Sequence, residues 1–241
     1  MGTRSTRAYF LLERILSKTK DIRSIASLFT VKNVLAFSEA AKNYDMVLAN
    51  SNTTANYVSA FYHRVPEGVV YPPLDVENYQ FRHDKENFIL VILKRGYGAH
   101  IDVLSKIAEK TKMKVIGYKV PNAEFLGERV SDHELKRLYS SALFLIYPYD
   151  SEYFGYIPIE AMASGTPVLA FKYSGGPSET IIDGKTGWLG YGEKDLYYKA
   201  VTIYEQGYND KFSENCRKRA LEFSVESRTK ELVQYIRSLH Q

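Results

Sequence analysis

From about residue 87 onward, short apolar runs alternate regularly with longer segments of helical period, and this alternation is the feature that most constrains the fold. The apolar runs that read as buried strands are 87–93, 114–118, 143–149 and 167–171. The segments of helical period are 100–112, 131–142, 156–165 and 193–207. Strands and helices that alternate in this way form a parallel sheet covered by helices. The sequence therefore predicts an α/β fold for this half of the chain.

Two local signals support the predicted helix boundaries. Ser131 stands three residues before Glu134, which is the spacing of a capping box at a helix start. Gly165 occupies the point where a helix must end before the next strand begins. We therefore expect one helix to begin near Ser131 and another to end near Gly165.

The chain before residue 80 has a different pattern, with a helical region over about 7–43, one strand at 46–50 and a helix at 53–61. Pro72 and Pro73 then impose an extended backbone without N–H donors, which suits a connector. One strand is too few for an independent doubly wound domain. The predicted organisation is a small, mostly helical, partial N-terminal lobe with its hinge at 1–80, a Rossmann-like domain at 81–222, and a C-terminal helix at 223–241 that packs back toward the N-terminal lobe.

Composition and charge exclude several classes of protein. The 241 residues are 45% hydrophobic and 25% charged, which is typical of a globular protein with a core. The net charge of +4 is spread along the chain without a polybasic run, so nucleic acid is not implied as a partner. The single cysteine, Cys216, excludes a disulfide framework and a multi-thiolate metal site.

The N-terminus bears on where the protein acts. Glu13 and Arg14 interrupt its apolar stretch, so this segment lacks the pattern of a signal peptide. No apolar run approaches the length that crosses a bilayer. We therefore expect a cytoplasmic protein. The basic segment 7–18 leaves peripheral contact with an anionic membrane open, although apolar residues in this pattern are more often a buried face.

The stretch "LFLIYPYDSEYFGYIPIEAM" reads as strand, loop and helix, and its loop must face the cleft beyond the carboxyl end of the sheet. Gly155 lets the backbone approach a ligand, and the N–H groups at the helix start favour an anion such as a phosphate. Glu152 and Glu160 flank this turn, and carboxylates accept hydrogen bonds from vicinal hydroxyls. The plainer alternative is an ordinary loop acid and a solvated helix residue.

The surrounding stretch, "EYFGYIPIEAMASGTPVLAFKYSGGPSETIIDGKTGWL", closely resembles the donor-site signature of the retaining GT-B glycosyltransferases of family four. The shared landmarks are an acid, an aromatic-glycine pair, a second acid after a seven-residue gap, a "GG" loop and "TGWL". Segments similar to the family extend over about residues 44–238. The resemblance implies a Rossmann-like parallel sheet of GT-B type with a shortened N-terminal domain.

The resemblance also implies roles for individual residues. Glu160 is expected to bind the ribose of a nucleoside-diphosphate sugar, and Glu152 to hold hydroxyls of the transferred sugar. The backbone at Phe154, Gly155 and Tyr156 is expected to cradle the diphosphate. The base is expected near Gly127 and Val130, after the third strand, and the loop with Gly175 and Gly176 is expected to close over the sugar.

Cations are expected to stabilise the departing diphosphate, since the family needs no obligatory metal ion and the chain contains no Asp-x-Asp motif. The family's loop after the first strand of this domain carries an arginine and then a lysine. This chain has Arg95, a candidate catalytic residue, and then His100 at the lysine's place. Lys94 is a substitute candidate. Neither a metal nor a cofactor is implied beyond the donor substrate.

The resemblance implies a retaining, metal-independent hexosyltransferase with an unidentified acceptor, which is a glycan, a lipid or a protein. Only about the last third of the family's acceptor-binding domain is present, so a homodimer partner or a separate subunit is a candidate source of the acceptor surface. The alternative is a nucleotide-sugar-binding module that lacks transfer activity of its own.

Overall fold

The computed structural model describes residues 35–94 and 98–239. Contacts divide the described residues into two compact units, of which the smaller comprises 35–49 with Thr54–Val69 and the larger comprises Asn50–Thr53 with 70–94 and 98–239. The predicted boundaries at residues 80 and 222, and the predicted packing of the C-terminal helix on the N-terminal lobe, stay predictions.

The larger unit is built on one parallel sheet of six strands in the order β5-β4-β3-β6-β7-β8. The strands are β3 (Glu86–Ile92), β4 (Met113–Ile116), β5 (Glu124–Gly127), β6 (Ala142–Tyr147), β7 (Val168–Phe171) and β8 (Gly187–Gly190). From β3 the chain adds β4 and β5 on one side. It then returns and adds β6, β7 and β8 on the other side of β3. The structure confirms the predicted α/β fold with a parallel sheet.

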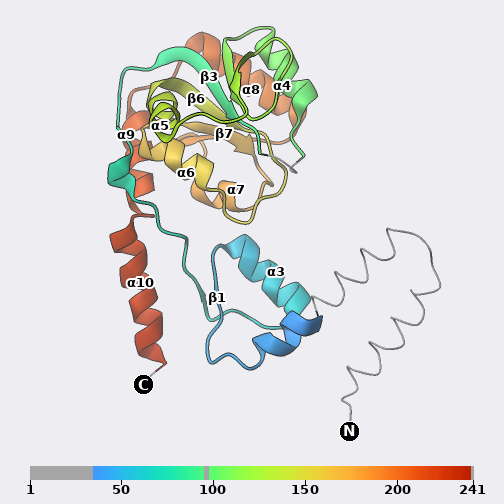
Figure 1. Ribbon diagram of the computed structural model, residues 1–241, viewed down its shortest axis with the longest axis vertical. Helices are drawn as coiled ribbons and strands as arrows, with labels where there is room; N and C mark the ends of the chain where they lie inside the picture. The colour runs from blue at the N-terminus through green and yellow to red at the C-terminus, as the bar shows by residue number, and fades with distance from the viewer. Residues whose placement is uncertain (1–34, 95–97, 240–241) are drawn as a thin grey trace, which may run out of the picture. The chain divides into compact units, whose positions relative to one another are not determined.

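Helices cover both faces of the sheet. The helices that follow β3 in this unit are α4 (Ile101–Ala108), α5 (Asp132–Ser141), α6 (Tyr156–Ala163), α7 (Gly176–Thr180), α8 (Glu193–Gln206), α9 (Lys211–Leu221) and α10 (Val225–Ser238), of which α10 has no buried residue and is not part of this cover. Helices α4 and α8 pack together on one face, while α5 and α6 pack together on the other (Figure 1). This two-sided cover explains why the central strands are continuously apolar.

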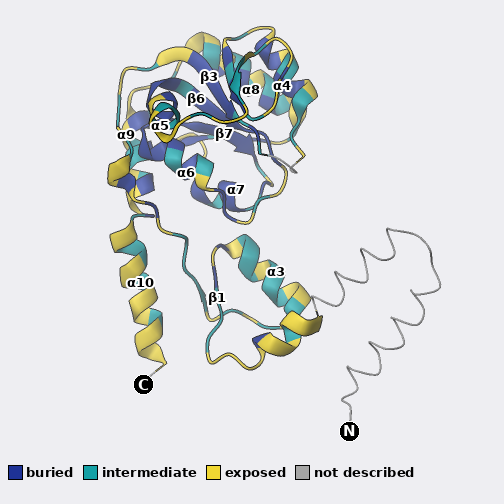
Figure 2. Ribbon diagram, in the orientation of Figure 1, coloured by how far each residue is buried: buried dark blue, intermediate teal, exposed yellow. Residues whose placement is uncertain are grey.

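The core lies along the central strands, which are the buried centre of Figure 2. Ile89, Leu90 and Val91 of β3 are fully buried, as are Leu145 and Ile146 of β6. Their side chains point alternately to the two faces, and both faces are covered. Burial of apolar surface on both sides therefore fixes the register of these strands.

Two strands of this six-stranded sheet lie outside the runs predicted from periodicity. Strand β5 is at the edge of the sheet and has no buried residue, so its sequence lacks an apolar run. Strand β8, with the sequence GWLG, contains two glycines. A Cβ on Gly187 would lie 2.0 Å from the carbonyl oxygen of Val168, so the neighbouring strand excludes any larger residue there. Contact with the neighbouring strand thus requires glycine at position 187, and a glycine weakens the sequence pattern by which a strand is predicted.

Both predicted helix signals are confirmed. The Ser131 hydroxyl accepts a hydrogen bond from the Glu134 N–H at 3.2 Å, at the start of α5. Gly165 follows the end of α6 with φ of +77°. A left-handed residue at this place lets the chain leave the helix and enter β7.

The smaller unit contains two short parallel strands, β1 (Leu48–Ala49) and β2 (Gly68–Val69). The predicted strand at 46–50 is therefore shorter than expected and has a partner. Helix α3 (Asn52–Tyr62) starts in the larger unit and continues in the smaller one. A 3₁₀ turn, η1 (Val76–Asn78), follows the connector. The predicted basic segment 7–18 lies outside the described residues.

Within residues 35–94 and 98–239, no helix has both the length and the apolar character needed to cross a bilayer.

Gly165 provides a test of this packing. A Cβ there would lie 2.6 Å from Cε2 of Phe81, whereas Gly184, with a similar φ of +72°, has no atom within 4 Å of its Cβ position. We expect Gly184→Ala to cost about 1 kcal/mol of unfolding free energy through backbone strain alone, and Gly165→Ala to cost about 1–3 kcal/mol more through overpacking. Urea denaturation of both variants measures the difference, and equal losses would contradict the packing at Phe81.

Candidate functional site

The residues predicted for the site gather at the carboxyl edge of the sheet in the larger unit. Glu152 and Gly155 follow β6, Gly175 and Gly176 follow β7, and Gly127 ends β5. The remaining predicted residues in the described ranges occupy the same loops or the helix starts next to them, and they are His100, Val130, Phe154, Tyr156 and Glu160. Open parallel sheets bind ligands at this edge.

The two central loops of the site are joined by backbone hydrogen bonds. The Glu152 N–H donates to the Ser174 carbonyl, and the Gly176 N–H donates to the Glu152 carbonyl, each at 2.9 Å. A Cβ on Gly175 would lie 2.4 Å from the Glu152 carbonyl oxygen, and one on Gly176 would lie 2.4 Å from Cα of Phe154. Only glycine fits at either place, so the "GG" pair is required for this close approach.

The Glu152 carboxylate is held by two side chains. Its Oε2 atom accepts hydrogen bonds from Nζ of Lys94 at 2.6 Å and from the Tyr147 hydroxyl at 2.8 Å. Burial opposes ionisation, but the hydrogen bonds from Lys94 and Tyr147 outweigh it and hold the pKa of Glu152 below its ordinary value. Glu152 is therefore a fixed anion with a cation beside it.

Helix α6 begins at the turn that was predicted to cradle an anion. Gly155 is its N-cap residue, with φ of +82°, and a Cβ there would lie 3.2 Å from Cγ of Glu152 and from Cγ of Pro177. The Phe154 side chain is buried and packs near Tyr71 and Phe223, so only its backbone can serve a ligand. The N–H groups at the helix start are the natural anion site here.

Glu160 lies one turn inside α6 and is not a solvated helix residue. Its Oε1 atom accepts a hydrogen bond from the Tyr79 hydroxyl at 3.1 Å, and its Oε2 atom accepts one from the Tyr139 hydroxyl at 2.7 Å. Burial, followed by the nearness of Glu160, raises the pKa of both tyrosines. Both hydroxyls thus stay protonated and orient the carboxylate, whose remaining lone pairs can accept ligand hydroxyls.

Sequence reasoning missed these two tyrosines. Tyr139 lies in α5 and Tyr79 follows η1, so neither is near Glu160 in the sequence. Their only signal was the high tyrosine content of the chain, which does not say where the rings meet.

His100 lies between two carboxylates. It is the N-cap residue of α4, and its Nε2 atom is 2.7 Å from Oδ2 of Asp150 while its Nδ1 atom is 2.5 Å from Oε1 of Glu193. Burial alone would lower the pKa of the ring, but Glu193 and Asp150 outweigh burial and raise it. The ring therefore joins α4, the loop after β6 and the start of α8. Arg95, the other predicted cation, lies outside the described residues.

A cavity opens beside the place predicted for the base. Its volume is about 350 Å³, and its lining comes from the ends of β3, β4 and β5: Leu93, Gly117, Tyr118, Glu128 and Arg129. A Cβ on Gly117 would lie 2.0 Å from the Leu93 carbonyl oxygen, so glycine is required where β4 ends. This glycine at the end of an apolar run was the signal that sequence reasoning could have used.

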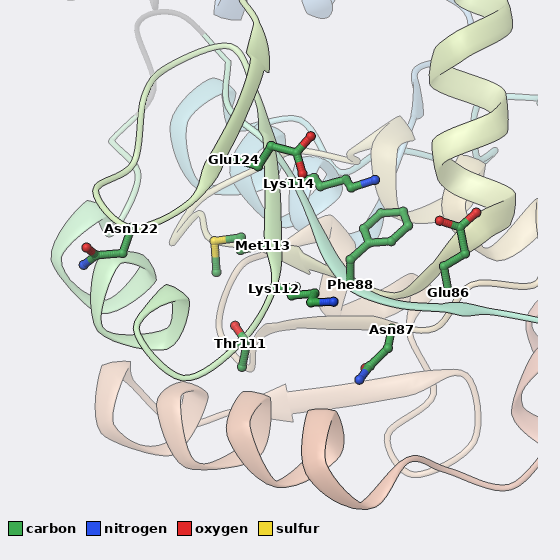
Figure 3. A pocket seen from close by; sticks show the side chains of 9 residues that line it. All are labelled: Glu86, Asn87, Phe88, Thr111, Lys112, Met113, Lys114, Asn122 and Glu124. Carbon is green, nitrogen blue, oxygen red and sulfur yellow. The ribbon is translucent and has the colours of Figure 1, made fainter.

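A larger cavity, of about 620 Å³, lies at the opposite, amino edge of the sheet and contains none of the predicted residues (Figure 3). Its lining includes Lys112 and Lys114 with Glu86 and Glu124, and the Lys114 ammonium lies 4.3 Å from the centre of the Phe88 ring. These are charges of a solvated strand edge, so size alone does not make this cavity the functional site.

Glu179 has a different role from the one suggested by its position in the first turn of α7. Its carboxylate accepts hydrogen bonds from the backbone N–H groups of Asn52 and Thr53 at 2.8 and 2.7 Å, and from the Tyr71 hydroxyl at 2.9 Å. Burial opposes ionisation, but the donors on Thr53 and Asn52 outweigh it and lower the pKa of Glu179. Glu179 thus caps the first turn of α3 from a distance.

Among the residues that the structure describes, no group of three or more His, Cys, Asp and Glu side chains is arranged to hold a metal ion.

Comparison with known proteins identifies the class of this protein. Residues 80–222, more than half of the chain, match the family described as glycosyl transferases group 1, and the chain belongs to this family. The resemblance carried by the "EAMASGTPV" and "GG" segments is thereby confirmed.

Two relatives with similar sequences are named mannosyltransferases. The alpha-1,3/1,6-mannosyltransferase alg-2 of Neurospora crassa is 40% identical over 101 residues, which cover 42% of this chain and 20% of that protein. The O-antigen chain mannosyltransferase RfbU of Salmonella typhimurium is 28% identical over 173 residues, which cover 66% of this chain and 44% of that protein. The match thus spans less than half the length of either relative.

Solved structures show the same fold. Anabaena HepE, determined in complex with UDP and glucose, superposes with a TM-score of 0.72 at 19% identity, covering 86% of this chain and 67% of that one. At this identity the likeness establishes the fold, which is the predicted GT-B type.

The His100 cluster predicts a pH-dependent stability. Because the folded pKa of His100 is raised, its contribution is complete below the ordinary histidine pKa of about 6.5 and is lost as pH rises through the folded value. Asp150 and Glu193 are largely exposed, so we expect His100→Gln to lower the melting temperature by only about 2 °C near pH 6 and by less above about pH 8.5. A melting series across this range measures it, with His133→Gln as control. A difference that does not change with pH would contradict the pairing.

Proposed function

We propose that this chain binds a nucleoside-diphosphate sugar at the carboxyl edge of its sheet and transfers the hexose to an acceptor hydroxyl, with retention of configuration and without a metal ion. The observation that carries this proposal is the pair of oriented carboxylates, Glu152 and Glu160, on either side of the start of α6. Such a pair suits a ligand with hydroxyls on both sides of a phosphate.

Each part of the donor has a place in this proposal. The ribose hydroxyls donate to Glu160, the diphosphate accepts from the backbone N–H groups around Gly155, and the sugar hydroxyls meet Glu152. The base occupies the cavity next to Gly127 and Val130. The loop with Gly175 and Gly176 closes the sugar end, since it is hydrogen-bonded to Glu152.

In the proposed reaction the acceptor oxygen bonds to the anomeric carbon. The bond between that carbon and the diphosphate oxygen breaks, and its electron pair stays on the diphosphate. The acceptor proton passes to the departing diphosphate. Charge on the leaving group is stabilised by the start of α6 and by cations of the loop after β3, where Arg95 is the expected residue.

The relatives guide the choice of donor and acceptor. Two of them are named mannosyltransferases, which favours mannose as the transferred hexose, and Anabaena HepE was solved with UDP and glucose. The acceptor is a glycan, a lipid or a protein, and we propose that a homodimer partner, a separate subunit or further chain completes its site. We place the reaction in the cytoplasm, with the basic segment 7–18 as a point of peripheral membrane contact.

A nucleotide-sugar-binding module without transfer activity is the second candidate. The observation that favours it is the engagement of both His100 ring nitrogens by Asp150 and Glu193, because a ring held by two carboxylates is not available to a phosphate. Donor binding without sugar transfer or hydrolysis would identify this alternative.

The proposal is tested by calorimetric titration, without added metal, with UDP, GDP, UDP-glucose and GDP-mannose. Selective binding of one base with its sugar nucleotide is the expected result, and it also identifies the donor. Absence of binding by all four nucleotides would reject the proposal.

Substitutions should separate the two carboxylates. Glu160→Ala should weaken nucleotide binding about 10- to 100-fold because ribose hydrogen bonds to a charged group are lost. Glu152→Ala should not weaken UDP or GDP binding and should lower turnover of the sugar nucleotide, measured as sugar transfer or donor hydrolysis. Glu205→Ala, on an exposed position of α8, is the control. Unchanged binding and turnover in both site variants would contradict the assigned roles.

A further inference from the structure

The donor site needs a fixed positive charge near the diphosphate, and His100 is poorly suited to provide it. Both of its ring nitrogens lie within 2.7 Å of carboxylate oxygens, one on Asp150 and one on Glu193. A phosphate that approached this ring would add a third anion or displace one of the two. Through these contacts His100 instead links α4 to the loop after β6 and to the start of α8.

Lys94 carries a cation on the same loop, and its backbone is well anchored. It follows β3, and its N–H donates to the Tyr149 hydroxyl at 2.5 Å. Its Nζ atom is 3.0 Å from the Tyr147 hydroxyl and 2.6 Å from Oε2 of Glu152. The ammonium also lies 5.5 Å from the centre of the Tyr147 ring and 5.9 Å from that of the Tyr149 ring. Its position is therefore set by two aromatic rings and one carboxylate.

This ammonium lies close to the start of α6. The Tyr147 hydroxyl, which it contacts, is 3.6 Å from the place of a Cβ on Gly155, and Cγ of Glu152 is 3.2 Å from the same place. Gly155 is the N-cap of the helix whose N–H groups are proposed to bind the diphosphate. The Lys94 side chain is 29% exposed, so a ligand in the cleft can reach it.

We propose that Lys94, rather than His100, is the catalytic cation that contacts the diphosphate and balances its charge as the sugar leaves. This inference rests on the proposed donor site and names a further residue of its machinery. When the bond between anomeric carbon and diphosphate oxygen breaks, the electron pair on that oxygen faces the ammonium. The proton of the acceptor hydroxyl passes to the diphosphate.

Glu152 has two opposite effects on the binding of a diphosphate at Lys94. The carboxylate that holds the sugar also aims the ammonium, so the sugar and the leaving group are positioned by one ion pair at 2.6 Å. A carboxylate this close also repels a diphosphate. The affinity for a nucleoside diphosphate therefore reflects the attraction of Lys94 less the repulsion of Glu152.

The experiment compares nucleotides that contain no sugar, so that contacts between Glu152 and the sugar do not contribute. GDP, UDP, GMP and UMP are titrated calorimetrically against the wild-type protein and the variants Lys94→Met, Lys94→Arg and His100→Gln. We expect Lys94→Met to weaken diphosphate binding about 10- to 100-fold and monophosphate binding less than about 3-fold, because a charge-assisted contact to the second phosphate is lost. Lys94→Arg should retain most of the affinity, and His100→Gln should change it less than about 3-fold.

Glu152→Gln should change diphosphate affinity in the opposite direction to Lys94→Met. Removal of the carboxylate charge leaves the ammonium in place and should strengthen diphosphate binding. If Lys94 served only to hold Glu152, Lys94→Met would lower donor turnover without changing diphosphate affinity. Circular dichroism and melting temperature establish that each variant is folded, and Lys94→Arg keeps the charge where Lys94→Met removes it.

The outcomes separate this inference from the donor site itself. A wild-type protein that binds none of the four nucleotides rejects the donor site, and the assignment of Lys94 falls with it. A wild-type protein that binds diphosphates while Lys94→Met binds them equally well rejects only the assignment of Lys94. Loss of diphosphate affinity in His100→Gln, with Lys94→Met unaffected, would return the role to His100.

Discussion

The candidate site depends on one close backbone approach, between the loop after β6 and the turn after β7. Glu152 exchanges hydrogen bonds with this turn, and the contact distances at Gly175 and Gly176 leave no room for a side chain. The parallel order of β6 and β7 brings the two loops to the same edge of the sheet. The glycine pair then allows the contact that places the Glu152 carboxylate beside the start of α6, where the proposed sugar and diphosphate contacts lie.

The charged side chains at the carboxyl edge of the sheet are oriented by their hydrogen-bond and ion-pair partners. Glu152 is paired with Lys94, and Glu160 is held by two tyrosine hydroxyls, so each carboxylate has a fixed direction. His100 contacts the carboxylates of Asp150 and Glu193 and so links α4 to the loop after β6 and to α8. A partly buried charge without such partners would be costly. Both ring nitrogens of His100 thus face acids, whereas the ammonium of Lys94 contacts the Tyr147 hydroxyl close to the start of α6.

The predictable part of this architecture follows from residue patterns that local chemistry enforces. The continuous apolar runs of β3 and β6 are visible because both faces of a parallel sheet are buried, and Ser131 caps α5 as its spacing predicts. Strands β5 and β8 were missed because an edge strand lacks a buried face and because Gly187 is imposed by a neighbouring strand. Periodicity reports burial by neighbours in general and does not reveal a requirement set by one close contact.

The sequence by itself determined the fold class, the family and the two acids at the turn, because strand and helix periods and the spacing of motif residues are local properties of the chain. Only the tertiary structure decided the partners: Tyr79 and Tyr139 at Glu160, Lys94 at Glu152, and Asp150 at His100. These pairs join elements far apart in the chain, and they form only when the sheet order brings those elements together. Hydrogen bonds and ion pairs act over a few ångströms in space, and distance along the sequence says little about which groups will meet.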